Sequence, residues 1–279
     1  MFTPTGEIVA ARTGVGAFNV ITIEHAEAIV AGAEAAGRPV ILQISENAVR
    51  FHHGRLGPIA AAARSLAEAA SVPVALHLDH VRSDELLAQA ARCGFGSVMY
   101  DAAHLPYAEN VARTAAAARA CQAMGLWVES ELGEVGGKDG AHAPGARTDP
   151  DEAAAYVAAT GVDALAVAVG SAHAMHTRTA RLDHALIARL SAAVPVPLVL
   201  HGSSGVPDGE LIAAVRGGMA KINIGTALNT AFTGAVRESL DGDAGLVDPR
   251  RYLASARAAM AETVATTLRL LSVAEPTHA

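Results

Sequence analysis

The sequence predicts an α/β protein folded as a single (β/α)8 TIM barrel with an extra C-terminal helix. Its 279 residues fit one barrel, since α/β barrels routinely exceed the usual length of a domain. Short aliphatic or β-branched runs alternate with alanine-rich stretches of helical periodicity. Eight such units between Gly14 and Leu240 have about 28 residues each, which is typical of this fold. We therefore expect one barrel domain over residues 1–279, including a helical extension over 248–271.

Each predicted strand is a short apolar run that ends near a polar residue, and each predicted helix follows one strand. In chain order, the strands are expected at 15–20, 40–44, 74–79, 97–100, 126–131, 164–169, 197–201 and 221–224. The helices are expected at 23–36, 58–70, 85–92, 108–124, 150–159, 184–193, 209–216 and 226–240.

Proline positions support these boundaries. Pro73 and Pro195 lie at the ends of two predicted helices, where the residue before a proline avoids the helical conformation. Pro150 and Pro207 lie at or just before the start of two others, because the first turn does not use the N–H that proline lacks.

Composition limits the class of protein and its partners. The chain carries 21 Lys and Arg against 28 Asp and Glu, a net charge of −7, with 51% hydrophobic residues. It can bury a large core, and nucleic acid or an anionic membrane is not expected as its main partner. Two cysteines are too few for a disulfide framework. Because the N-terminal residues do not resemble a secretory signal, we expect a cytoplasmic protein.

Polar residues stand at the carboxyl ends of the predicted strands, which is where barrel enzymes carry their active sites. A ring of polar groups around one mouth is costly to hold unless it binds something. These strand ends therefore predict a single site. Its residues are Asn19, Ser45, Asp79, His80, Asp101, Glu129 and Glu131, together with segments 170–173, 201–204 and 223–226.

Three histidines follow different strands and predict a metal centre. His80, His173 and His201 would meet at one mouth in this register, as the ligands of a catalytic Zn²⁺ with an open fourth position. Strand alternation places His77 and Asp79 on one face and His80 in the loop just past the strand. Two alternatives stay open: His80 caps a helix with Asp79 as its partner, or, among twelve histidines, the agreement is a coincidence. His77 is predicted as a hydrogen-bonded core residue.

Two glycine- and hydroxyl-rich segments, 201–205 and 223–226, follow the last two strands. Many barrels bind phosphate there through backbone N–H groups and a helix N-terminus, although ordinary turns use the same residues. Arg50, His52 and His53 follow the second strand and form either a solvated loop or an anion pocket.

The segment between Glu131 and Thr148 is too long and too glycine-rich for a simple turn. It is predicted as a mobile active-site lid carrying Lys138 and Asp139. Glu131 is expected near the mouth, and Glu129, which is deeper on the same face, is expected as a structural acceptor.

Several motifs occur in one order over nearly the whole chain. They are Ala17-Phe18-Asn19, Gln43-Ile44-Ser45, Leu76-His77-Leu78-Asp79-His80, Val128-Glu129-Ser130-Glu131-Leu132-Gly133, Val169-Gly170-Ser171-Ala172-His173, Leu200-His201-Gly202-Ser203-Ser204, Lys221-Ile222-Asn223 and Asp248-Pro249-Arg250. Jointly they resemble the class II, metal-dependent ketose-bisphosphate aldolases, which act on fructose or tagatose 1,6-bisphosphate.

The resemblance implies an aldolase, a carbon–carbon lyase. It would reversibly cleave a ketose 1,6-bisphosphate to dihydroxyacetone phosphate and glyceraldehyde 3-phosphate through a Zn-stabilised enediolate. It also implies that Asp79 exchanges the proton on the C4 oxygen and that a lid acid exchanges the proton on the carbanion carbon. Glu131 and Asp139 complete the predicted catalytic set. The implied ligands of one catalytic Zn²⁺ are His80, His173 and His201.

The resemblance further implies the substrate contacts and the assembly. In this family the arginine that matches Arg250 reaches the second phosphate, in some members from a neighbouring subunit. A homodimer or homotetramer is therefore expected. A monovalent cation near the phosphate site is an optional second ion. The predicted substrate- and phosphate-binding residues are Asn19, Ser45, Gly170, Ala174, Gly202, Ser203, Ser204, Asn223, Gly225, Thr226 and Arg250.

The chain departs from the family pattern at a few positions. Val81 follows the third-strand motif where a small residue, histidine or cysteine is usual, and Ala174 stands where glycine is usual. Asp139 occupies the lid position of a glutamate, which leaves the base that acts on the enediolate undetermined. Gly225 replaces a commonly polar residue. No metal ligand is lost, but the ketose phosphate is not fixed.

Other readings of the same residues remain. Lys221, one of two lysines, could form a Schiff base if desolvation activates it. The chain could act on another ketose phosphate or on a deoxy-keto sugar acid phosphate. It could also be a sugar-phosphate-binding barrel without catalysis.

Overall fold

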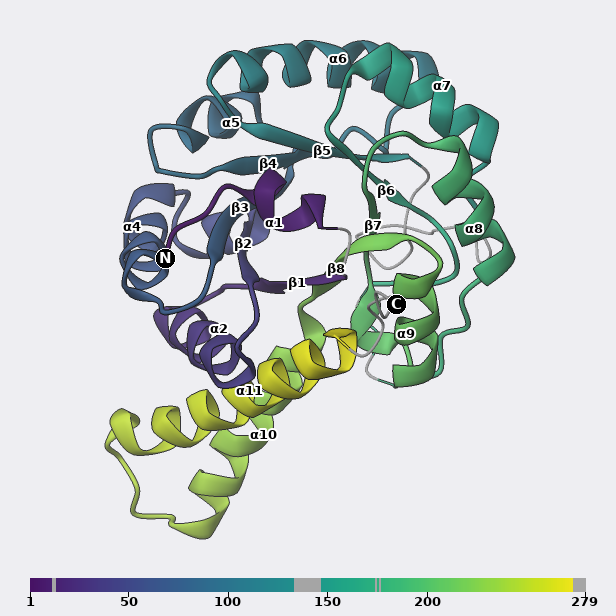
Figure 1. Cartoon of the computed structure of the whole chain (residues 1–279). Helices are drawn as coiled ribbons and strands as arrows, with labels where there is room; N and C mark the ends of the chain where they lie inside the picture. Colours follow the sequence, from purple (N-terminus) through teal and green to yellow (C-terminus); the bar gives the residue numbers. More distant parts are fainter. Residues whose placement is uncertain (12–13, 133–146, 174, 176, 273–279) are drawn as a thin grey trace.

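A computed structural model describes residues 1–272 except 12–13, 133–146, 174 and 176. Eight parallel strands pair in chain order and close into a barrel, with helices around the outside (Figure 1). The strands are β1 (Val15–Asn19), β2 (Val40–Ser45), β3 (Val74–Val81), β4 (Ser97–Tyr100), β5 (Trp127–Leu132), β6 (Ala164–Val167), β7 (Leu198–Leu200) and β8 (Met219–Ile224). The predicted fold class is confirmed.

The helices that follow the strands are those the sequence predicts, with ends shifted by at most two residues. They are α2 (Ile23–Ala36), α4 (Leu56–Ala69), α5 (Asp84–Ala90), α6 (Tyr107–Ala123), α7 (Pro150–Thr160), α8 (His184–Ala193), α9 (Asp208–Arg216), α10 (Thr226–Gly242) and the C-terminal α11 (Pro249–Ser272). None of the helices in the described part of the chain combines the length and apolar character needed to cross a membrane.

Three short elements were not predicted: α1 (Thr5–Ala10), α3 (Glu46–Phe51) and the 3₁₀ turn η1 (Ser203–Gly205). Helix α3 corrects the expected loop after the second strand, because it contains Arg50. It forms there because the Ser45 hydroxyl caps it, accepting a hydrogen bond from the Ala48 N–H at 3.2 Å. His52 lies just after α3, and one of its ring nitrogens is 2.7 Å from the Ile21 carbonyl oxygen.

One end of the barrel is closed by apolar packing, which leaves the other end for the site. Ile8 and Val9 of α1 pack against residues from the beginnings of strands, including Val15, Ile41 and Ala75. Figure 1 shows α1 lying across this opening of the barrel. At the carboxyl ends of the strands, Ser45 pairs in register with Asp79, so polar side chains face the open mouth.

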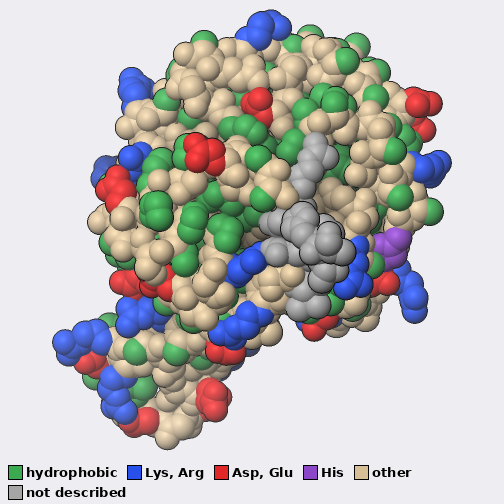
Figure 2. Space-filling view, viewed as in Figure 1, with side chains coloured by type: hydrophobic (Ala, Val, Ile, Leu, Met, Phe, Trp, Pro, Cys, Tyr) green, Lys and Arg blue, Asp and Glu red, His purple; other side chains and the backbone are tan. Residues whose placement is uncertain are grey.

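Helices α10 and α11 form a hairpin that is attached to the barrel at one end only. The part near the barrel packs against α2, where a Cβ on Gly32 would lie 2.5 Å from the Ala261 carbonyl oxygen. Arg250 lies at the tip, since α10 ends at Gly242 and α11 begins at Pro249. This tip projects away from the barrel (Figure 1). Charged side chains of both signs gather on this projection (Figure 2).

Candidate metal centre and substrate pocket

The three predicted metal ligands come together at the carboxyl end of the barrel. His80 lies in β3, His173 in the loop after β6, and His201 directly after β7. Their ring centroids are 4.8 to 5.7 Å apart. One nitrogen from each ring lies within 4.8 Å of the other two. The donor set is three imidazoles, the set that a catalytic Zn²⁺ takes when its fourth position is left to substrate.

His80 reaches this position through a local distortion of β3. Its φ of 51° is in the left-handed region, which costs energy for a residue with a Cβ. The pairing of β3 with β4 shifts register between Leu78 and Val81, so the strand continues past the distortion. Asp101, directly after β4, holds the ring, with its Oδ2 3.3 Å from His80 Nδ1. The expected loop position of His80 is therefore wrong, because the bulge keeps it within the strand.

His201 is held by two carboxylates from β5. Its Nε2 lies 2.9 Å from Glu129 Oε1, and its Nδ1 lies 2.8 Å from Glu131 Oε2. Burial opposes protonation, but the bonds to these carboxylates outweigh it and raise the pKa of His201 to about 9. Both ring nitrogens therefore lie beside a carboxylate, Nε2 beside Glu129 and Nδ1 beside Glu131, so negative charge surrounds this ring. The residues present therefore fit a divalent ion, which would take the place of a proton there.

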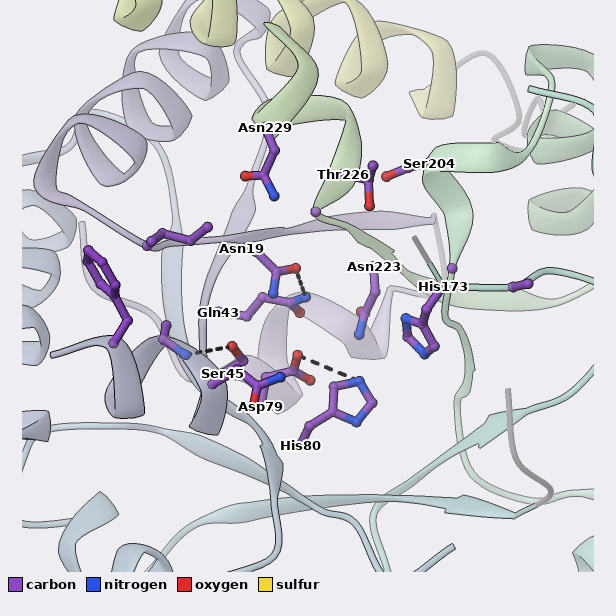
Figure 3. A pocket seen from close by; sticks show the side chains of 17 residues that line it. Asn19, Gln43, Ser45, Asp79, His80, His173, Ser204, Asn223, Thr226 and Asn229 are labelled. Atoms are coloured by element: carbon purple, nitrogen blue, oxygen red, sulfur yellow. Dashed lines mark hydrogen bonds and ion pairs between the residues drawn. The ribbon is translucent and has the colours of Figure 1, made fainter. Parts of the chain in front are cut away.

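Asp79 lies beside the histidine cluster as a buried carboxylate. Its Oδ2 is 3.8 Å from His80 Nε2, and this pair is drawn in Figure 3. Burial opposes ionisation, but His80 and then Lys221 and His77 outweigh it and keep the pKa of Asp79 below its usual value. Within the described chain no group hydrogen-bonds its Oδ1. Asp79 therefore presents an anionic, proton-accepting oxygen next to the candidate metal centre.

A cavity of about 460 Å³ opens in front of these groups (Figure 3). Gln43 donates a hydrogen bond to Asn19 Oδ1 at 2.7 Å on one side of it. Both side-chain polar atoms of Asn223 are buried, and neither has a hydrogen-bond partner in the described structure. Such atoms are costly unless a ligand pairs with them. The lining residues from the predicted set are Asn19, Ser45, Asp79, His80, His173, Gly202, Ser204, Asn223, Gly225 and Thr226.

The loops after β7 and β8 each contain a glycine, but only Gly202 has the left-handed backbone that favours one. Gly202 has a φ of 67°, and a Cβ there would lie 2.6 Å from the backbone of Ala172. A Cβ on Gly225 would lie 3.0 Å from Asn19 Oδ1, which accounts for the small residue at this position. Ser204 Oγ accepts a hydrogen bond from the Ala227 N–H in the first turn of α10, so the two loops are joined.

Several predicted residues do not line the cavity. Glu131 is buried against His201, and Ser203 is buried with its hydroxyl donating to the Leu200 carbonyl. Gly170 turns the chain at a φ of 119° close to the Arg181 carbonyl oxygen. Arg250 is at the hairpin tip, with 88% of its side chain exposed, and pairs with Asp248. Asp139, Ala174 and the expected lid with Lys138 lie outside the described residues.

The cavity also has lining residues that the predicted site omits: Ile21, Gln43, Asn47, Ala48, Phe51 and Asn229. Strand alternation could have found Gln43, which shares a face with Ser45. Asn229 stands three residues after Thr226, so both project from one face at the start of α10. Asn47 and Phe51 could not be placed, because α3 was not predicted.

His77, Glu129 and Lys221 lie deeper in the barrel and are buried, as the sequence predicts for His77 and Glu129. His77 Nδ1 lies 2.8 Å from the Ser97 hydroxyl oxygen, and burial lowers its pKa to about 3. Glu129 is fully buried and receives a hydrogen bond from Lys221 Nζ at 2.8 Å. Since the Lys221 amine is buried and ion-paired and is not part of the cavity wall, the Schiff-base reading is not favoured.

Fold and site together define a class of protein: a (β/α)8 barrel with a three-histidine candidate metal centre, an adjacent carboxylate and two glycine-containing loops at one mouth. Comparison with known proteins narrows this class. The sequence profile of the family described as Fructose-bisphosphate aldolase class-II matches residues 7–275. The chain belongs to this family.

Relatives and solved structures agree over most of the chain. A fructose-bisphosphate aldolase from Thermus caldophilus is 39% identical, over 92% of this chain and 92% of its own. A fructose-bisphosphate aldolase from Staphylococcus aureus (strain Mu50 / ATCC 700699) is 39% identical, over 90% of this chain and 88% of its own. The crystal structure of the YdjI aldolase from Escherichia coli K12 superposes with a TM-score of 0.85 at 33% identity, covering 97% of both chains.

Proposed function

We propose that this protein is a zinc-dependent aldolase that cleaves a ketose 1,6-bisphosphate of the fructose or tagatose type. The products would be dihydroxyacetone phosphate and glyceraldehyde 3-phosphate. The observation that carries the proposal is the meeting of His80, His173 and His201 next to the Asp79 carboxylate in one polar cavity. Family membership supports the same reaction.

The residues at the loops after β7 and β8 bind the dihydroxyacetone phosphate half of the substrate. Gly202 lets the backbone approach a phosphate group, while Ser204 and Thr226 offer hydroxyl groups from the same wall of the cavity. Asn223 offers an amide whose polar atoms have no other described partner. Such fixed donors hold the substrate so that its reacting atoms stay aligned.

Asp79 moves the proton that cleavage requires. As a carboxylate in the cavity wall, it accepts the proton of the C4 hydroxyl during cleavage and returns it during condensation. Zn²⁺ held by the three imidazoles would supply a Lewis acid that polarises the substrate carbonyl group. Glu131 holds the ring of His201, and Asp139 is proposed to exchange the proton on the carbanion carbon.

The second phosphate calls for a cation that the described cavity wall does not contain, since its residues include no Lys or Arg. We assign this role to Arg250 of the partner subunit in a homodimer or homotetramer. The exposed position of Arg250 on a projecting hairpin supports this assignment. The single-domain organisation over 1–279, a cytoplasmic location and a monovalent cation near the phosphate loops belong to the same proposal.

A coupled assay of the purified, zinc-loaded protein tests the function. Fructose and tagatose 1,6-bisphosphates are compared with ketose monophosphates and with a deoxy-keto sugar acid phosphate. We expect cleavage of at least one bisphosphate, its loss on treatment with a chelator, and its return with Zn²⁺. Activity that survives the chelator, or labelling of Lys221 by borohydride in the presence of substrate, would overturn the proposal. Binding of these sugars without turnover would favour a non-catalytic barrel.

A further inference from the structure

The barrel interior below the metal centre contains an ion pair that the proposed reaction does not use. Lys221 of β8 and Glu129 of β5 both have fully buried side chains, and Lys221 Nζ donates to Glu129 Oε2 at 2.8 Å. Neither residue lines the substrate cavity. Burying two charges is costly, and a buried pair often adds little to stability compared with apolar residues. Stability alone therefore does not account for this buried pair.

The pair is connected to the metal centre through one hydrogen bond. Glu129 uses its two oxygens separately: Oε2 receives the Lys221 ammonium, and Oε1 lies 2.9 Å from His201 Nε2. With a metal ion bound to His201, this hydrogen bond would keep the ring proton on Nε2. Since Nε2 donates to Glu129, Nδ1 is the nitrogen that we assign to the metal, and its contact of 2.8 Å with Glu131 Oε2 would give way to the ion.

We propose that Lys221 is a positioning residue for the metal centre, acting through Glu129 on His201. The inference rests on the zinc site proposed above. The ammonium group balances the charge of Glu129 and fixes its carboxylate plane, and the carboxylate in turn sets the ring orientation of His201. Carboxylate partners of metal-bound histidines orient the ring and raise its basicity, and their loss typically lowers metal affinity by about 10- to 100-fold.

A variant pair separates positioning from a merely structural role. Lys221→Met keeps the length and apolar stem of the side chain but leaves Glu129 as an uncompensated buried charge. The double variant Lys221→Met with Glu129→Gln removes that charge, while the Gln amide oxygen can still accept the His201 Nε2 proton. A buried polar group away from the centre provides the control: Tyr156→Phe, whose hydroxyl bonds Ser130 on the same strand β5.

Zinc affinity of the purified chain is measured by competition with a chromophoric chelator, with circular dichroism to verify folding. We expect Lys221→Met to bind Zn²⁺ about 10- to 100-fold more weakly than the wild type. The double variant should recover part of that loss, because the Gln oxygen still accepts the His201 proton but carries no charge. Tyr156→Phe should leave the affinity unchanged. Equal affinity in Lys221→Met and wild type, or no recovery in the double variant, would overturn the inference. A wild-type chain that binds no Zn²⁺ would overturn the proposed function instead.

If Lys221→Met fails to fold, the double variant and the wild type still test the inference. Nitrogen NMR of the zinc-loaded wild type is expected to show His201 with its proton on Nε2 and the metal on Nδ1. Metal on Nε2 would break the connection from Lys221 to the centre and refute the inference.

Discussion

Replacing Asp79 by Asn tests the assignment of the proton-transfer group. The two side chains have nearly the same shape, so the substitution removes the basic oxygen and leaves the cavity wall in place. Asp79 is only 2% exposed, and its Oδ1 has no hydrogen-bond partner among the described residues. Because solvent has little access to that point, water cannot easily replace the carboxylate as a base.

The expected loss is set by what a positioned base contributes. General acid–base catalysis supplies about 10²- to 10⁴-fold, or roughly 3 to 5 kcal/mol of transition-state stabilisation. We therefore expect kcat for cleavage to fall by about 10²- to 10⁴-fold in Asp79→Asn. Zinc affinity should change far less, because His80, His173 and His201 are all retained. The KM for the bisphosphate should also stay within a few-fold, since the phosphate loops are untouched.

Two assays together make the test specific. The coupled cleavage assay measures kcat, and proton NMR in D2O follows exchange of the carbanion-carbon hydrogen of dihydroxyacetone phosphate. Asp79 acts only on the C4 oxygen, so the exchange should persist in the variant while cleavage is lost. Cleavage within threefold of the wild-type rate would refute the role of Asp79. Loss of both reactions together with zinc binding would show that Asp79 builds the metal centre rather than moving a proton.

Three further predictions follow from particular contacts. Gly202→Ala should destabilise the fold by about 2 to 4 kcal/mol, because the φ of this residue is 67° and the added Cβ would meet the Ala172 backbone. Gly37→Ala is the matched control: its φ is 63° but its Cβ would meet nothing, so this substitution should cost less. Thermal unfolding compares the two, and equal losses would contradict the clash. Tyr156→Phe should lower the free energy of unfolding by about 1 to 3 kcal/mol, because the hydroxyl group hydrogen-bonds with Ser130, Asn110 and Thr114. Urea unfolding measures this loss, and kcat should not change. An unaltered unfolding midpoint would count against this network. Arg250→Ala should raise the KM for a bisphosphate about 10-fold or more and leave the KM for a monophosphate unchanged, with Arg251→Ala as the control. If the arginine acts across subunits, mixing the Arg250→Ala and Asp79→Asn proteins should restore activity. No recovery on mixing would argue against a shared site.

The fold could be predicted because its strands and helices differ in periodicity and are separated by proline and glycine. The eight strands and the helices after them all appear close to their predicted positions. Helix α1 was missed because six residues give too short a pattern, and α3 because its start depends on a cap at Ser45 that also ends β2. Both short helices depend on tertiary packing more than on their own sequence.

The three histidines could be placed together because strand ends in a parallel barrel all meet at one mouth. That prediction depended on the register of the strands and not on the spacing of the histidines in the sequence. The bulge that keeps His80 inside β3 could not be foreseen, because Val81 has no local feature that marks a bend. The position of Arg250 on a projecting hairpin likewise depends on how α11 packs against α2 and α10, which periodicity does not report.

Anomalous diffraction at the zinc absorption edge, from crystals grown with Zn²⁺, shows whether the three histidines hold one metal ion. We expect one strong peak per chain, within bonding distance of a ring nitrogen from each of His80, His173 and His201, with His201 bound through Nδ1. A peak elsewhere, or a centre that lacks any of these three rings, would contradict it.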